Sequence, residues 1–124
     1  MLSRQAQGAS CVKLLSPVSA ANTAAATSSW TDVRAAEGDI VFICEVGAIT
    51  GTLAWSVEHA SDSGGTGAAA ITPNDGAFGA VTANTVQKRC VAADAVAGWV
   101  RVIGTIGTGP SIVASSIMYH PKYI

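Results

Sequence analysis

The sequence predicts an all-β protein, a compact antiparallel β-sandwich of jelly-roll-like or partly closed barrel form, with an extended N-terminal arm. Short apolar stretches from Trp30 onward are separated by Gly, Asp, Asn and Pro, a spacing typical of sandwiches and barrels. Several of these stretches alternate apolar and polar residues, as strands with one buried face do. At 124 residues, the chain is long enough for one such core and too short for two.

Residues 1–29 are expected to form the arm, with one short strand, and residues 30–124 the sandwich domain. The strand is predicted at the apolar cluster Cys11–Leu15, which Pro17 closes. Ala20–Ser29 contains many alanines but has no apolar stripe and several weak helix formers, so we expect an extended connection. Residues 1–10 show no helix or strand pattern, and we expect them to lie against a neighbouring chain.

The sandwich domain contains five predicted strands. Ile40–Cys44 is apolar on both faces, which is typical of a central strand covered on both sides. Leu53, Trp55 and Val57 alternate with more polar residues, whereas Val86–Val91 alternates less clearly.

The last two predicted strands, Trp99–Ile106 and Ile112–Tyr119, are joined by a turn at Gly107–Pro110. The Gly-, Ser- and Asp-rich tract Ser61–Gly76 is expected to be an exposed loop. Val46–Thr52 and Ile103–Gly109 have a similar texture, and each leads into a further strand. We therefore expect two similar hairpins or arches, with glycines in their turns.

The composition favours a protein that binds copies of itself or a partner. Charged residues make up 12% of the chain, about half the usual share. So few charges leave much neutral surface to be covered. The net charge of −1 favours neither nucleic acid nor an anionic membrane as a partner. No signal peptide or membrane-spanning stretch is evident, so we expect the protein to be made in a cytosol.

Cysteine and histidine offer little chemistry. Cys11, Cys44 and Cys90 are far apart and odd in number, so we interpret them as buried small apolar side chains rather than disulfide partners or metal ligands. His59 with Asp62 is the only pair that suggests a hydrolase. No nucleophile motif accompanies this pair, and a surface histidine at a strand end is the favoured interpretation. We expect no enzyme activity, no cofactor and no metal.

The three tryptophans suggest either a binding surface or a core. A row of exposed rings would stack against sugars, but tryptophan in a small β protein is more often core or interface. Trp55 and Trp99 lie in alternating strands and are predicted to be core. Trp30 lies beside Asp32 and Arg34 and is the preferred interface anchor.

A second candidate interface is basic. Lys88 and Arg89 on one predicted strand, with Arg101 on another, could present a small basic spot to an acidic neighbour. A solvated strand face explains these residues equally well.

The order and texture of several segments resemble those of small proteins encoded in the head-gene region of tailed bacteriophages, the capsid decoration or cement class. The resemblance spans about residues 30–122, and the segments that carry it are Trp30–Arg34, Glu37–Val41, Val46–Thr52, Val57–Asp62 and Trp99–Thr105. It implies a β-rich protein on the outer surface of a virion, bound to the major capsid protein, often as a homotrimer, and assembled in the host cytoplasm. The alternative is a carbohydrate- or receptor-binding module of a head fibre or tail.

Overall fold

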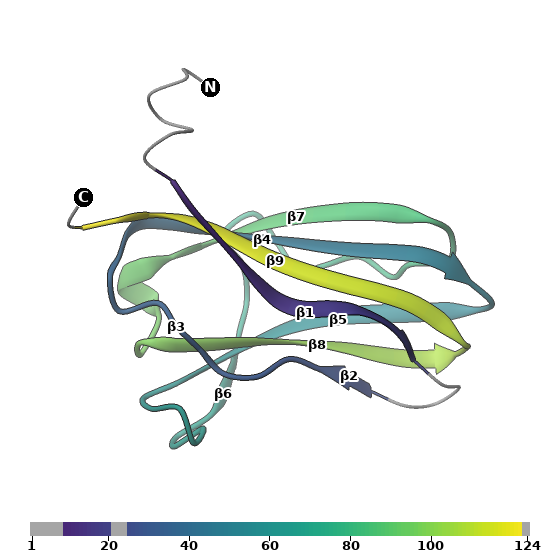
Figure 1. The fold of residues 1–124 in the computed structure, drawn as a ribbon, viewed down its shortest axis with the longest axis horizontal. Helices are drawn as coiled ribbons and strands as arrows, with labels where there is room; N and C mark the ends of the chain where they lie inside the picture. Colours follow the sequence, from purple (N-terminus) through teal and green to yellow (C-terminus); the bar gives the residue numbers. More distant parts are fainter. Residues whose placement is uncertain (1–8, 21–24, 123–124) are drawn as a thin grey trace.

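The computed structural model describes residues 9–20 and 25–122 (Figure 1). Most of this part of the chain is in β-strands. Its strands are β1 (Ser10–Ala20), β2 (Ala25–Thr27), β3 (Thr31–Asp32), β4 (Ala36–Ile49), β5 (Thr52–Ala60), β6 (Ala69–Ile71), β7 (Thr85–Ala92), β8 (Trp99–Thr108) and β9 (Ser111–Pro121). One 3-10 turn, η1 (Ala93–Ala95), follows β7.

The strands form two layers, as Figure 1 shows. Sheet A has the order β1-β9-β4-β7, and sheet B has the order β2-β8-β5-β6, with β3 also paired to β8. Every pairing is antiparallel. With β2 and β3 counted as one interrupted strand, this is the strand order of a jelly roll. The predicted all-β sandwich is therefore confirmed, and β4 lies inside its sheet, as expected. Only one face of β4 is fully buried, however, because Val41 and Ile43 on the other face are half-buried, which corrects the prediction that both faces are covered.

Residues 10–20 and 25–27 belong to the sandwich, which corrects this part of the predicted arm of residues 1–29. β1 pairs with β9 from Ser10 opposite Tyr119 to Ala20 opposite Ser111. It continues through Pro17, which is tolerated because β1 is an edge strand and the ladder is irregular there. Pairing along β9 extends the strand well past the apolar cluster that the sequence showed. The predicted contact of residues 1–10 with a neighbour falls mainly on residues 1–8, which lie outside the described residues.

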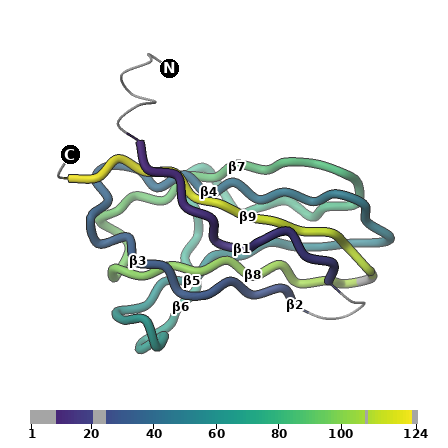
Figure 2. The backbone as a smooth tube through the Cα atoms, in the orientation of Figure 1, coloured from purple at the N-terminus to yellow at the C-terminus, as the bar shows by residue number. Residues whose placement is uncertain are grey.

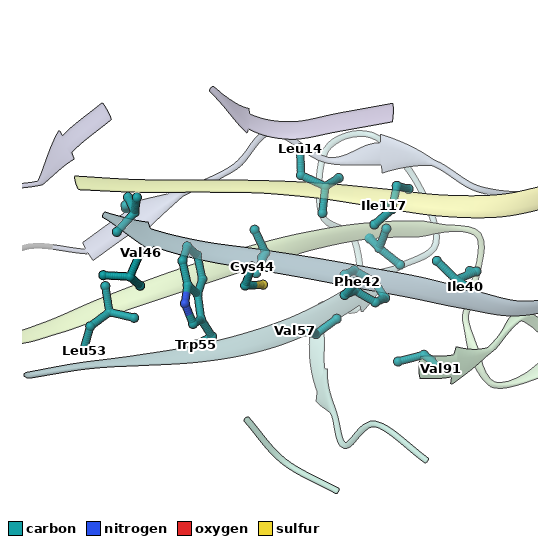
Figure 3. Packing of buried hydrophobic residues seen from close by; sticks show 14 of the residues in the cluster. Leu14, Ile40, Phe42, Cys44, Val46, Leu53, Trp55, Val57, Val91 and Ile117 are labelled. Carbon is teal, nitrogen blue, oxygen red and sulfur yellow. The ribbon is translucent and has the colours of Figure 1, made fainter. Parts of the chain in front are cut away.

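The two sheets enclose one core (Figure 3). Alternate side chains of β4, among them Ile40 and Phe42, point inward and are fully buried. Trp55 of β5 reaches the core and is 4% exposed, as predicted. Its ring lies against Gly104 of β8, where an added Cβ would be 3.0 Å from Trp55 Cζ3. A glycine at this position therefore gives the indole its space.

The repeated texture of residues 46–52 and 103–109 corresponds to two arches. β4 leads from sheet A to β5 in sheet B, and β8 leads from sheet B back to β9 in sheet A. The arches meet at one end of the sandwich, where the Thr50 N–H donates to the Pro110 carbonyl at 3.1 Å. Both connections therefore cross between the sheets, whereas a hairpin would join neighbours within one sheet.

Two smaller expectations are corrected. The tract Ser61–Gly76 contains the short strand β6, which adds to the edge of β5. Of the three cysteines only Cys44 is buried, whereas Cys11 is exposed and Cys90 half-buried, because both lie on the outer side of edge strands. Burial raises the pKa of the Cys44 thiol to about 12. Its Sγ lies 3.5 Å from the hydroxyl oxygen of Ser115, in the same interior.

Candidate functional site

Four of the six residues predicted from the sequence meet on the outer face of sheet B. We call this group, with its two partners, the Trp30 cluster, and its members are Trp30, Asp32, Arg34, Glu58, Trp99 and Arg101. The short strand β3 pairs with the start of β8 and brings the first three residues beside the last two. Val100 and Val102 of β8 are buried, so the residues that alternate with them face outward.

Arg101 is the centre of the cluster. It lies directly opposite Glu58 on β5, and its Nε donates to Glu58 Oε1 at 2.7 Å. The guanidinium carbon is 4.5 Å from the centroid of the Trp30 ring, within the range of a cation–π interaction. Both charged side chains are largely covered, at 29% and 24% exposure. Arg101 is therefore held between a carboxylate and an aromatic ring.

Arg34 repeats this arrangement nearer to solvent. Its Nε and Nη2 donate to the two carboxylate oxygens of Asp32, at 3.0 and 2.8 Å, in a bidentate pair. Its guanidinium carbon lies 5.4 Å from the centroid of the Trp99 ring. The hydrogen bonds from Arg34 hold the pKa of the Asp32 carboxyl below its ordinary value, and Asp32 raises the pKa of Arg34. The pair stays charged and is exposed, so a partner can reach it.

A tight loop after β5 completes the cluster and projects beyond β6 in Figure 2. Gly65 has φ +83°, and an added Cβ would lie 2.7 Å from Trp30 Nε1, so only glycine fits against the ring. The carboxylate of Asp62 accepts from the backbone N–H groups of Gly64 and Thr66, at 2.9 and 3.2 Å. These bonds, those with Thr66 foremost, lower the pKa of Asp62. The loop is therefore held against Trp30 by its own hydrogen bonds.

The predicted basic spot does not form. Lys88 is exposed on sheet A, opposite Ile43, whereas Arg101 lies on sheet B. Arg89 points differently again: its Nε donates to the Ala77 carbonyl, and its guanidinium lies 5.6 Å from the ring centroid of Phe78. Neighbouring residues of a strand point to opposite faces, so Lys88 and Arg89 could share a patch only if the strand were irregular.

His59 and Asp62 have separate structural roles. His59 Nδ1 accepts a hydrogen bond from the Ala97 N–H at 3.0 Å, which ties β5 to the segment before β8. Asp62 is engaged by its own loop. In residues 9–20 and 25–122, no three His, Cys, Asp or Glu side chains gather as metal ligands, and no helix is long and apolar enough to cross a membrane.

Glu58 and Trp99 of the cluster, and Gly65 packed against it, were not predicted as site residues. Trp99 was expected in the core, yet it is half-buried on the outer face, which corrects that expectation. The alternation was a usable signal, because buried Val100 and Val102 require residues 99 and 101 to face outward together. The partnership of Glu58 with Arg101 depends on the register between β5 and β8, which no local pattern reveals.

Comparisons with known proteins give no family. No known protein family matches the chain, and no curated protein matches it. Among solved structures, the chain is similar to the crystal structure of PirA, with 9% sequence identity and a TM-score of 0.48. The match covers 91% of this chain and 93% of PirA. A similarity this low carries no argument about function.

Proposed function

We propose that this protein is a structural capsid decoration or cement protein that binds the outer surface of a phage head and bridges subunits of the major capsid protein. In this proposal it has no substrate, works on the virion surface, and stabilises the shell by adding contact area between capsomers. The sequence resemblance motivates the choice of partner, including a trimeric arrangement on the shell. The Trp30 cluster is the structural observation that supports a binding role.

The cluster has the chemistry of a protein interface. Tryptophan and arginine are the residue types most enriched among the contacts that dominate binding energy. Here two of each lie together on one sheet face, held in place by two ion pairs. A preformed surface loses little conformational freedom on binding. The cluster is also neutral as a whole, which suits a partner without a strong charge of its own.

The fold is compatible with this role by analogy only. Jelly rolls are common in viral capsid and lectin domains, and many unrelated functions share the fold. The fold therefore allows both the decoration role and the carbohydrate-binding alternative. The arrangement of the tryptophans favours the first.

Less ring surface is open to a sugar than the sequence suggested. Trp55 is buried, and one face of Trp30 and one of Trp99 are each taken by a guanidinium group. The carbohydrate- or receptor-binding alternative stays a proposal that calorimetric titration with a saccharide panel would test. Saturable heat at a defined stoichiometry would favour it over the decoration role.

Co-sedimentation with undecorated mature phage shells tests the decoration role. We expect stoichiometric binding of the wild-type chain. Arg34→Glu should weaken it by about tenfold or more, which corresponds to about 1.4 kcal/mol. This exposed substitution should leave the fold intact. Ser56→Ala, exposed on the same face but outside the cluster, is the matched control. Absence of stoichiometric wild-type binding would refute the decoration role, and equal binding by Arg34→Glu would exclude the Trp30 cluster as the contact.

A further inference from the structure

The outer face of sheet A presents apolar side chains to solvent. Buried Phe42, Cys44 and Val46 point inward along β4, so the residues between them face outward. The largest apolar residues of this outer face are Leu15, Val41, Ile43, Val86, Ile112 and Met118. Val86 is 62% exposed and Ile112 is 46% exposed. Extended apolar faces on small soluble domains commonly mark interaction sites.

The charged side chains among these apolar residues include Lys13 of β1, Glu45 of β4 and Lys88 of β7. All three are exposed, and within the described residues none forms an ion pair. Glu45 lies opposite Val86, and Lys88 lies opposite Ile43, so the two charges are diagonal neighbours on adjacent strands. When two copies meet through the same face about a two-fold axis, a residue of one copy can contact a different residue of the other, and the reverse contact forms as well. Two opposite charges on one face can therefore form two ion pairs between the copies.

We infer that this face binds the same face of a second copy about a two-fold axis that places each Glu45 over the partner copy's Lys88. Neighbouring strands of a sheet lie about 4.8 Å apart, and alternate residues of one strand lie about 7 Å apart. With these spacings, an axis that exchanges Glu45 with Lys88 runs across the middle of the face, diagonal to the strands. The two sheets then overlap and their strands cross steeply, as in the orthogonal class of sheet packing. The pairing forms twice, once on each side of the axis.

The shape of the face, which has a hollow over β9, suits this arrangement. A hollow of about 390 Å³ lies over β9, where Ala114 and Ser116 are small and Lys13, Leu15 and Glu45 stand around them. When the sheet is treated as flat, with the strand and residue spacings given above, the axis that exchanges Glu45 with Lys88 places the second copy's Ile43 over this hollow. The two-fold contact therefore places the apolar side chain of Ile43, which is half-buried in the single chain, against a depression, and it also matches opposite charges.

The contact is small. Sheet A is about 19 Å wide, so two steeply crossing faces share about 400 Å² of flat area, and more when the relief of the side chains is included. Stable interfaces bury about 800 Å² on each partner. We therefore expect a dimer with a dissociation constant on the order of micromolar or weaker. The pairing does not depend on capsid binding, because it uses the sheet opposite to the Trp30 cluster.

Charge reversal with mixing provides the test. Lys88→Glu and Glu45→Lys are each made in the full chain, and the mass in solution is measured by sedimentation over about 10 µM to 1 mM, a range set by the expected affinity. Each variant alone brings like charges together twice and should dimerise at least about tenfold more weakly than the wild type. An equimolar mixture should regain wild-type dimerisation, because both charge pairs of the heterodimer are again opposite.

Lys122→Glu is the matched control, because it changes the charge of the chain by the same amount but lies after β9, outside both the exchanged pair and the hollow. It should dimerise as the wild type does, and circular dichroism should confirm that every variant is folded. A monomeric wild type at the highest concentration would overturn the inference. So would a mixture that stays as weak as its components, or a trimeric mass that ignores these substitutions. None of these outcomes bears on shell binding, which the co-sedimentation experiment measures separately.

Discussion

The outer faces of the two sheets carry charge in different ways. On sheet B, Asp32 pairs with Arg34 and Glu58 with Arg101, and each guanidinium covers a tryptophan ring. On sheet A, exposed charges stand among apolar side chains with no ion pair in the described part of the chain. The first face is held by contacts within the chain, whereas in our proposal the second is completed by a second copy. The difference suggests two kinds of contact on opposite sides of one sandwich.

The largest expected effect removes the core that both faces share. Phe42 is fully buried between the sheets, and Phe42→Ala should lower the free energy of unfolding by about 3–5 kcal/mol, through lost burial and a cavity. Urea unfolding followed by circular dichroism measures the loss. We expect shell binding and self-association to weaken together. Loss of one without the other would mean that the faces are supported independently.

A second change affects sheet B alone. Gly65→Ala forces a side chain against Trp30 at a positive φ, whereas Gly67→Ala, at φ +68°, meets nothing within 4 Å. Gly67→Ala should cost about 1 kcal/mol for its backbone conformation. Gly65→Ala should cost about 1–2 kcal/mol more because of overpacking. Urea unfolding followed by tryptophan fluorescence compares the pair, and equal losses would contradict the close contact with Trp30.

A third change separates the covered ion pair of the Trp30 cluster from the exposed one. Arg101→Ala leaves the half-buried Glu58 without its partner and uncovers Trp30, and it should cost about 1–2 kcal/mol. Arg34→Ala should leave the unfolding free energy unchanged within error, because its side chain is 66% exposed. The same urea titrations test both variants. If Arg34→Ala lowered the free energy of unfolding more than Arg101→Ala does, the Asp32–Arg34 pair would be the more stabilising of the two, contrary to this prediction.

The smallest expected effect is on pH dependence. The pKa of Asp62 is lowered in the folded chain, so its stabilising contribution is present above its unfolded value of 3.8 and is lost as the pH falls through the lower folded value. Stability should therefore drop slightly below about pH 4. Asp62→Asn should show a smaller drop when unfolding is compared at pH 7 and pH 3. An identical acid response would show that the loop bonds do not depend on the charge.

Local sequence patterns predicted the strands with clear alternation and missed those held by pairing. Leu53, Trp55 and Val57 indicated β5 because the period of two is a property of the chain itself. β6 and the second half of β1 have no such signal, because their strand conformation is stabilised by hydrogen bonds to β5 and β9, distant in sequence. Contacts between distant strands were missed at the site as well. Trp30, Asp32, Arg34 and Arg101 were predicted, but Glu58 and Trp99, which contact the two arginines, were not.

The sequence by itself determined that the chain is an all-β sandwich, because alternation, turn residues and length are local or additive properties. Tertiary structure alone decided the jelly-roll order, the two faces and the groups that meet on them. A strand's register places Arg101 opposite Glu58 and Lys88 diagonal to Glu45. Register depends on how distant strands bury their apolar sides together. The predicted basic spot was wrong for this reason, and so was the arm over residues 10–20 and 25–27, since each depended on which strand lies beside which.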